Sequence, residues 1–268
     1  MAVKRYFASK DNTITNAFKS DLLTRGTGSN MGASDILETF VIHGQTSASI
    51  NATNAEQARI LIQFPVEDIV TDITNGVVPS SSVQYRLVMT NAPHADTTPI
   101  DYSLEVAMVS GANWIEGTGL DMEEYTDSGV CNWLSSSNGS VWPGLPRIDD
   151  GQNPNSGGSY FTGSAEGQIS ASYHFSGGLE DLDIDVTFAI DKWRRSPGGA
   201  NNYGFLIKHP NDIISGSSGS FFTKRFFSRT SDYYLNRPYL EARWDSARKD
   251  NRSNAVISSS LAPASFNI

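Results

Sequence analysis

Apolar and polar side chains alternate in short segments that are spread over most of the chain's 268 residues. The alternation is clearest in residues 182–190, where Leu182, Ile184 and Val186 are separated by acidic residues. A period of two places every second side chain on the same face, which predicts a β-strand with one face on a core. The chain is therefore restricted to folds that are built from many short strands.

The same pattern predicts strands elsewhere, and one of them is marked by its flanks. Pro238 precedes residues 239–244, at a place where a proline can begin a strand without removing a ladder hydrogen bond. The further segments that we expect to be strands are residues 12–18, 35–43, 58–64, 85–90, 102–109, 169–175 and 203–208. Their spacing is typical of an antiparallel β-sandwich with long loops.

The composition supports this fold class and limits the setting. Only 18% of the residues are charged, and turn-forming residues are abundant, so little helix is expected. Cys131 is the only cysteine and cannot form an intramolecular disulfide, which favours folding in a reducing compartment. No apolar run approaches the roughly 20 residues that cross a bilayer, so no membrane insertion is expected.

The domain organisation is predicted from changes in composition along the chain. Residues 1–245 are expected to form a single β-sandwich domain. Between about residues 110 and 168, Gly, Ser, Asn and Asp become frequent, which predicts a long loop insertion. The polar residues 246–268 are expected to be a C-terminal extension that leads into a further domain.

Aromatic and basic residues alternate in the late part of the chain. Three aromatic pairs lie between residues 221 and 234, with Lys224, Arg225 and Arg229 among them and Arg237 just after. Such interleaving could stack on single-stranded nucleic acid. Alternatively, the rings fill a core and the arginines pair with carboxylates. A net charge of −9 favours the second interpretation and no nucleic-acid partner.

Catalytic and phosphate-binding motifs are not recognisable. The four histidines are scattered, no zinc-ligand spacing can be written, and there is no Gly-x-Ser-x-Gly elbow. The glycine-rich residues 25–34 lack the Gly-Lys-Ser/Thr ending of a phosphate loop, so we interpret them as a flexible turn. The chain is therefore predicted not to be an enzyme.

Two weaker candidate sites lie in the long insertion. Trp114, Trp133 and Trp142 could form a platform for sugar stacking, or could pack the insertion onto the sandwich or onto a neighbouring subunit. An acidic cluster could bind structural calcium, the one cofactor considered, or could simply be solvated. Its members are Glu116, Asp121, Glu123, Glu124 and Asp127.

The order of several short motifs resembles the DNRLRE-type domains. The motifs lie at residues 32–37, 59–64, 114–117, 132–133, 203–205, 227–229 and 237–241. The resemblance spans about residues 6–245 and implies a jelly-roll-like, carbohydrate-binding-module-like β-sandwich. The ending at residues 237–252 is most similar to versions in structural proteins of tailed phages, especially marine and cyanobacterial ones.

The resemblance implies a non-enzymatic virion protein that is assembled in the host cytoplasm. Its expected place is a tail fibre, a collar or another tail component, with a capsid decoration protein or a module for a cell-surface polysaccharide as alternatives. We expect contacts with other virion proteins, homo-oligomerisation, and in the last case a host surface glycan. Arg225, Arg229 and Arg237 are candidate ion-pair residues at such interfaces.

Overall fold

The computed structural model describes residues 1–43, 55–95, 98–120, 130–143, 157–162, 168–195, 200–214 and 221–247. About 40% of the described residues are in strands and 12% in helices. The strands form two large antiparallel sheets and one small two-stranded sheet. The predicted fold class, an all-β, jelly-roll-like antiparallel sandwich with little helix, is confirmed.

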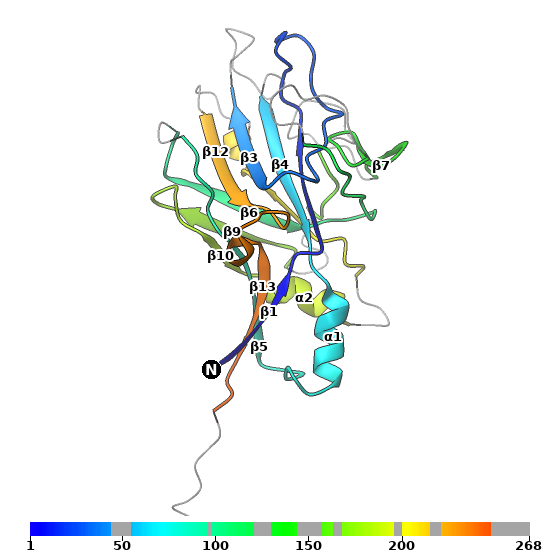
Figure 1. The fold of residues 1–268 in the computed structure, drawn as a ribbon, viewed down its shortest axis with the longest axis vertical. Coiled ribbons are helices and arrows are strands. Elements are labelled where there is room, and N and C mark those ends of the chain that lie inside the picture. The colour runs from blue at the N-terminus through cyan, green and yellow to red at the C-terminus, as the bar shows by residue number, and fades with distance from the viewer. Residues whose placement is uncertain are drawn as a thin grey trace, which may run out of the picture.

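The smaller of the two large sheets, sheet A, occupies the lower half of the view in Figure 1. Its four strands, in spatial order, are β1 (Ala2–Phe7), β13 (Tyr239–Trp244), β5 (Val83–Met89) and β10 (Leu182–Asp185). Ala2 lies opposite Trp244 in the register of β1 and β13. The first described strand, β1, therefore lies at the edge of this sheet, and the last described strand, β13, lies beside it.

The larger sheet, sheet B, lies above sheet A (Figure 1). Its path, in spatial order, is β12 (Phe221–Phe227), β3 (Ile36–Ile42), β4 (Glu56–Gln63), β11 (Phe205–Lys208), β6 (Tyr102–Met108) and β9 (Ser170–Phe175). A seventh strand, β2 (Lys10–Thr15), also pairs with β4. Residues 221–227 of the aromatic and basic segment thus form a strand, which the sequence pattern did not indicate.

Both faces of sheet B are buried over much of their area. Ile60 and Ile62 of β4 lie in the main core cluster, which sheets A and B share. Leu61 points the other way, into a second cluster on the outer face of sheet B. Seven of the eight residues of β4 are buried as a result. Because β4 is covered on both faces, it has apolar residues at consecutive positions and not only at alternate ones.

Helices cover one flank of the main core. These are α1 (Val66–Thr74) and α2 (Thr187–Trp193), and the other described helical segments are α3 (Asn211–Ile214) and the 3₁₀ turn η1 (Tyr234–Asn236). Figure 1 shows α1 and α2 beside the strands of sheet A. Val66 and Ile69 of α1 belong to the main core, one helical turn apart on the same face. None of the described helices is long and apolar enough to span a membrane.

The prediction of one strand over residues 182–190 is wrong in its second half. β10 ends at Asp185, and α2 begins at Thr187. Val186, Ala189, Ile190 and Trp193 are all buried, and their spacing of three, four and seven residues is that of a helix face. The apolar residues of this segment fit both the period of two of a strand and the period of 3.6 of a helix. Packing of the helical face against the core decides in favour of the helix.

Candidate functional site

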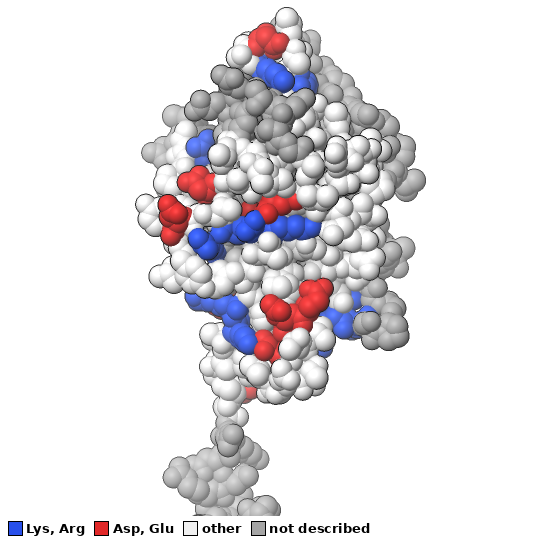
Figure 2. Space-filling view, turned by 45° about the vertical axis from the view of Figure 1, so that its right-hand side comes forward, with Lys and Arg blue, Asp and Glu red and all other residues white. Residues whose placement is uncertain are grey.

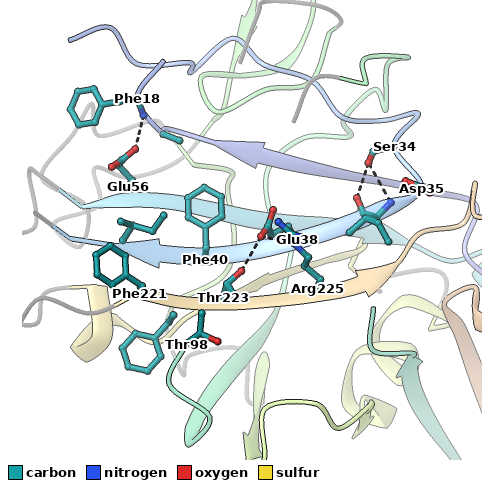
Figure 3. A pocket seen from close by; sticks show the side chains of 14 residues that line it. Phe18, Ser34, Asp35, Glu38, Phe40, Glu56, Thr98, Phe221, Thr223 and Arg225 are labelled. Atoms are coloured by element: carbon teal, nitrogen blue, oxygen red, sulfur yellow. Dashed lines mark hydrogen bonds and ion pairs between the residues drawn. The ribbon is translucent and has the colours of Figure 1, made fainter. Parts of the chain in front are cut away.

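A groove of about 660 Å³ lies on the outer face of sheet B, where β3 and β12 form the margin of the sheet. The alternation of β3 places Glu38, Phe40 and Ile42 on this face. Phe221 and Arg225 of β12 lie on the same face, since Phe221 pairs with Ile42 and Arg225 with Glu38. Figure 3 shows these side chains projecting from the two strands into the groove.

Apolar side chains line one end of the groove. The ring of Phe40 packs with Ala17 and Ala58 in a small cluster of its own, with Ile42 against it. Phe221 is 54% exposed and extends into solvent beside this floor (Figure 3). A fixed ring below and an exposed ring at the side give an apolar surface that a ligand can cover at small conformational cost.

A paired carboxylate and guanidinium form the polar part of the groove. Glu38 Oε1 accepts hydrogen bonds from Arg225 Nε and Thr223 Oγ1, each at 2.9 Å. The Arg225 side chain is 42% exposed while Glu38 is largely buried. The pair is therefore oriented by the strand register, with the cation facing the solvent.

A second carboxylate lies at the apolar end, because Glu56 pairs with Ile42 in the register of β3 and β4. Glu56 Oε2 accepts the backbone N–H of Phe18 at 2.8 Å (Figure 3). Burial raises the pKa of Glu56 above its ordinary value, although the Phe18 amide and the charge of Arg25 oppose this shift. The guanidinium of Arg25 lies 4.0 Å from the centre of the Phe18 ring. These contacts hold the wall of the groove in place.

The predicted sugar-stacking platform is wrong for the three tryptophans. Trp114, Trp133 and Trp142 are at most 1% exposed and belong to the cluster on the outer face of sheet B. The indole N–H of Trp114 donates to Tyr203 O and that of Trp142 to Asn132 O, both at 2.9 Å. No ring face is open to a ligand, and the rings instead pack the long insertion onto the sandwich, which was the alternative interpretation.

The described parts of that insertion are an integral part of the fold. They carry the small hairpin of β7 (Ser135–Ser137) and β8 (Ser140–Val141). The glycine-rich residues 25–34 are not simply a flexible turn either, because Asn30, Met31 and Gly32 are buried against the insertion. A Cβ atom on Gly32 would collide with the backbone of Glu116. The glycine therefore allows close approach of two loops.

Of the predicted calcium ligands, Glu116 is the one that the structure describes. Its carboxylate accepts hydrogen bonds from the Arg229 guanidinium (Nε at 2.5 Å) and from the Asp11 backbone N–H at 2.7 Å. The other members lie outside the described residues: Asp121, Glu123, Glu124 and Asp127. Within the described part of the chain, no group of three metal-ligating side chains is assembled. Calcium binding stays a prediction.

Asp11 beside this ion pair predicts a pH dependence of stability. Burial raises the pKa of Asp11 from 3.8 to about 7, and the Glu116 carboxylate adds to the shift, although the Arg229 N–H opposes it. The folded state therefore binds this proton more tightly, so its contribution is complete below about pH 4 and is lost as the pH rises to about 7.

Asp11→Asn should remove that dependence, since the amide oxygen can still accept the Arg229 N–H. The free energy of unfolding of the variant, relative to the natural chain, should rise by about 2 to 4 kcal/mol between pH 4 and 8. Urea unfolding at several pH values measures this difference, with exposed Asp232→Asn as control. A difference that is constant with pH would contradict the assignment.

The three candidate interface arginines all have partners within the chain. Arg225 pairs with Glu38, Arg229 pairs with Glu116, and Arg237 Nε donates to Ser231 O at 2.8 Å. Pairing of the arginines with carboxylates, the alternative to nucleic-acid stacking, is thus seen for two of them. Figure 2 shows basic and acidic side chains beside one another on one face, without a large patch of one charge there.

The groove combines residues that are distant in sequence, and the sequence did not reveal it. Arg225 was singled out, but Glu38 and Phe40 were interpreted only as strand residues, and Phe221 only as part of the aromatic and basic segment. One available signal was Glu38 within a mostly apolar strand, because a charge on a largely buried strand requires a partner.

Comparison of the sequence with protein-family models and with curated proteins finds no match. The resemblance to DNRLRE-type domains thus remains an interpretation of sequence motifs. Function has to be inferred from the geometry of the surface, and above all from the groove.

Proposed function

We propose that this chain is a non-enzymatic structural protein of a bacteriophage particle, which acts through contacts with other virion subunits. A tail fibre, collar or other tail-associated position is the proposed place, and a capsid decoration position is the alternative. The β-sandwich supports the proposal because it is the fold that the phage-like motifs imply. The proposed site of contact with a neighbouring subunit is the groove beside β12.

The observation that carries this proposal is the state of the charged groups in the groove. Glu38 is already held by Arg225 and Thr223, and Glu56 by the Phe18 N–H. Charges that are paired in advance orient a partner and lose little on binding, whereas acid–base catalysis needs a group that is free to exchange a proton. Exposed Phe221 beside them supplies the apolar area of a contact.

Phe221→Ala should reduce incorporation of the protein into particles about tenfold or more, as expected for loss of an interface anchor. The fold should be retained because the ring is 54% exposed. Quantitative mass spectrometry of purified particles, assembled with the variant, measures the copy number. Val141→Ala, which truncates another exposed apolar side chain, is the control. Equal incorporation of both variants would count against the groove as the contact.

A second candidate function is a binding module for a cell-surface polysaccharide. It is favoured by the combination of Phe40 and Phe221 rings with the Glu38 and Arg225 hydrogen-bonding groups, since sugars present apolar faces and hydroxyls together. Titration calorimetry with fragments of host polysaccharide tests this function. Binding that is lost in Phe221→Ala would favour it, and an absence of heat with all fragments would dismiss it.

A further inference from the structure

We propose that the outer face of sheet A is a contact surface between two copies of this chain, related by a twofold axis parallel to the strands between β13 and β5. The proposal concerns the opposite layer of the sandwich from the groove and does not depend on the proposed function. It is carried by the order of charges across the four strands.

One row of side chains crosses the whole sheet in register. Arg5 of β1 lies opposite Glu241 of β13, Glu241 lies opposite Arg86 of β5, and Arg86 lies opposite Asp185 of β10. The signs along the row are therefore plus, minus, plus, minus. The ends of the row are the most open, since the Arg5 side chain is 48% exposed and Asp185 is exposed.

The middle of the row is already neutralised within the chain. Glu241 accepts from Arg5 Nε at 2.8 Å and from Arg243 Nε at 2.7 Å. Arg86 Nε donates to Asp183 at 2.5 Å. The face therefore presents ordered charges whose desolvation is partly compensated, which lowers the cost of covering them with a second surface.

The alternating row is complementary to itself in one orientation. Rotation about an axis parallel to the strands reverses the row, so Arg5 meets Asp185 of the partner subunit and Glu241 meets Arg86 of the partner subunit. Rotation about an axis along the row would instead place like charges together. The charge order therefore selects one isologous arrangement, in which each surface meets its own copy.

The neighbouring rows and turn extend this surface. In the next row, Phe7 lies opposite Tyr239, and Tyr239 lies opposite apolar Val88. The same rotation therefore brings Tyr239 against Val88 of the partner subunit. The Phe7 ring lies 4.7 Å from that of Tyr234, which is 55% exposed. Leu235 beside it is 77% exposed. Four strands alone cover about 400 Å², below the roughly 800 Å² of a standard interface, so the dimer should be weak without this aromatic margin.

The test mixes two variants, each of which has one reversed charge. Arg5→Glu alone should oppose Asp185 of the partner subunit, and Asp185→Lys alone should oppose Arg5 of the partner subunit, so each should weaken self-association about tenfold or more. A mixture of the two should associate as a heterodimer, because both contacts are then between opposite charges. Residues 5 and 185 lie about 14 Å apart across four strands, so the rescue cannot arise within one chain.

Sedimentation equilibrium from about 1 µM to about 1 mM, with native mass spectrometry of the mixture, measures these associations. A concentration-dependent dimer of the natural chain, weakened singles and a rescued mixture would support the proposal. A natural chain that stays monomeric, or a mixture that does not associate, would overturn it. Phe221→Ala in the groove should dimerise normally, which separates this result from a failure of the proposed function.

A second measurement applies if either charge variant unfolds. Arg243 lies opposite Gln84 within the sheet, so the same axis places Arg243 near Gln84 of the partner subunit. Mixed Arg243→Cys and Gln84→Cys chains should form an interchain disulfide under mild oxidation, while the native Cys131 is buried. Cross-linking no faster than that of a mixture of Val141→Cys and Gln84→Cys would contradict the arrangement.

Discussion

Asn30→Ala should lower the free energy of unfolding by about 3 to 5 kcal/mol, because it removes all four hydrogen bonds of one buried amide. Asn30 Nδ2 donates to Glu116 O at 2.8 Å and to Cys131 O at 2.7 Å. Its Oδ1 accepts the N–H of Gly32 at 3.2 Å and of Gly119 at 2.8 Å. The side chain thus joins the glycine-rich loop to two parts of the long insertion.

Urea unfolding measures the change, and tryptophan fluorescence locates it. A loosened insertion should expose the buried indoles of Trp114 and Trp133, which shifts their emission to longer wavelength before the sandwich unfolds. Asn201→Ala is the matched control, because that exposed amide loses a single hydrogen bond, to the Tyr203 hydroxyl. Equal effects of the two substitutions would show that the insertion is not held through Asn30.

Lys224→Met should destabilise the fold by a similar amount, about 3 to 5 kcal/mol, although it conserves the side-chain volume. Lys224 is fully buried, and Nζ donates to Asn91 Oδ1 and Glu180 O at 2.7 Å and to Gly178 O at 2.8 Å. The ammonium also lies 4.7 Å from the centre of the Phe175 ring. The substitution leaves three acceptors without their donor.

The location of these acceptors explains why the effect should extend beyond one strand. Asn91 follows β5 of sheet A, and residues 178–180 connect β9 of sheet B to β10 of sheet A. Lys224 therefore hydrogen-bonds to segments that lead into and out of both sheets, beside β12. Lys19→Met, in the loop after β2, is the control and should change the free energy of unfolding by only a few tenths of a kcal/mol. A comparable loss in both variants would contradict this role.

The strand pattern could be predicted from the sequence where a strand buries one face, as in sheet A. Residues 239–244 match β13 in both bounds, and residues 102–109 match β6 to within one residue. α1 was missed although Val66, Ile69, Val70 and Ile73 have the i, i+3, i+4, i+7 spacing of an amphipathic helix, so this signal was present in the sequence. The segment of β12 was not among the predicted strands, because its inward residues include Lys224, whose burial depends on distant acceptors.

The candidate site could not be predicted for a related reason. The groove requires the register of β3 with β12, which no local pattern specifies, and the approach of Phe18 from the loop after β2. The tryptophans attracted attention because exposed rings bind sugars, but the sequence does not show which way a ring faces. Their burial was decided by apolar residues such as Leu61 on the outer face of sheet B.

The chain is proposed to work through surface contacts within a phage particle. Cryo-electron microscopy of whole particles from the source tests this proposal most directly. We predict density for this sandwich at a defined symmetric position on the tail or collar, with the groove between β3 and β12 covered by a neighbouring subunit. Particles without this fold, or with the groove open to solvent in every copy, would contradict the account.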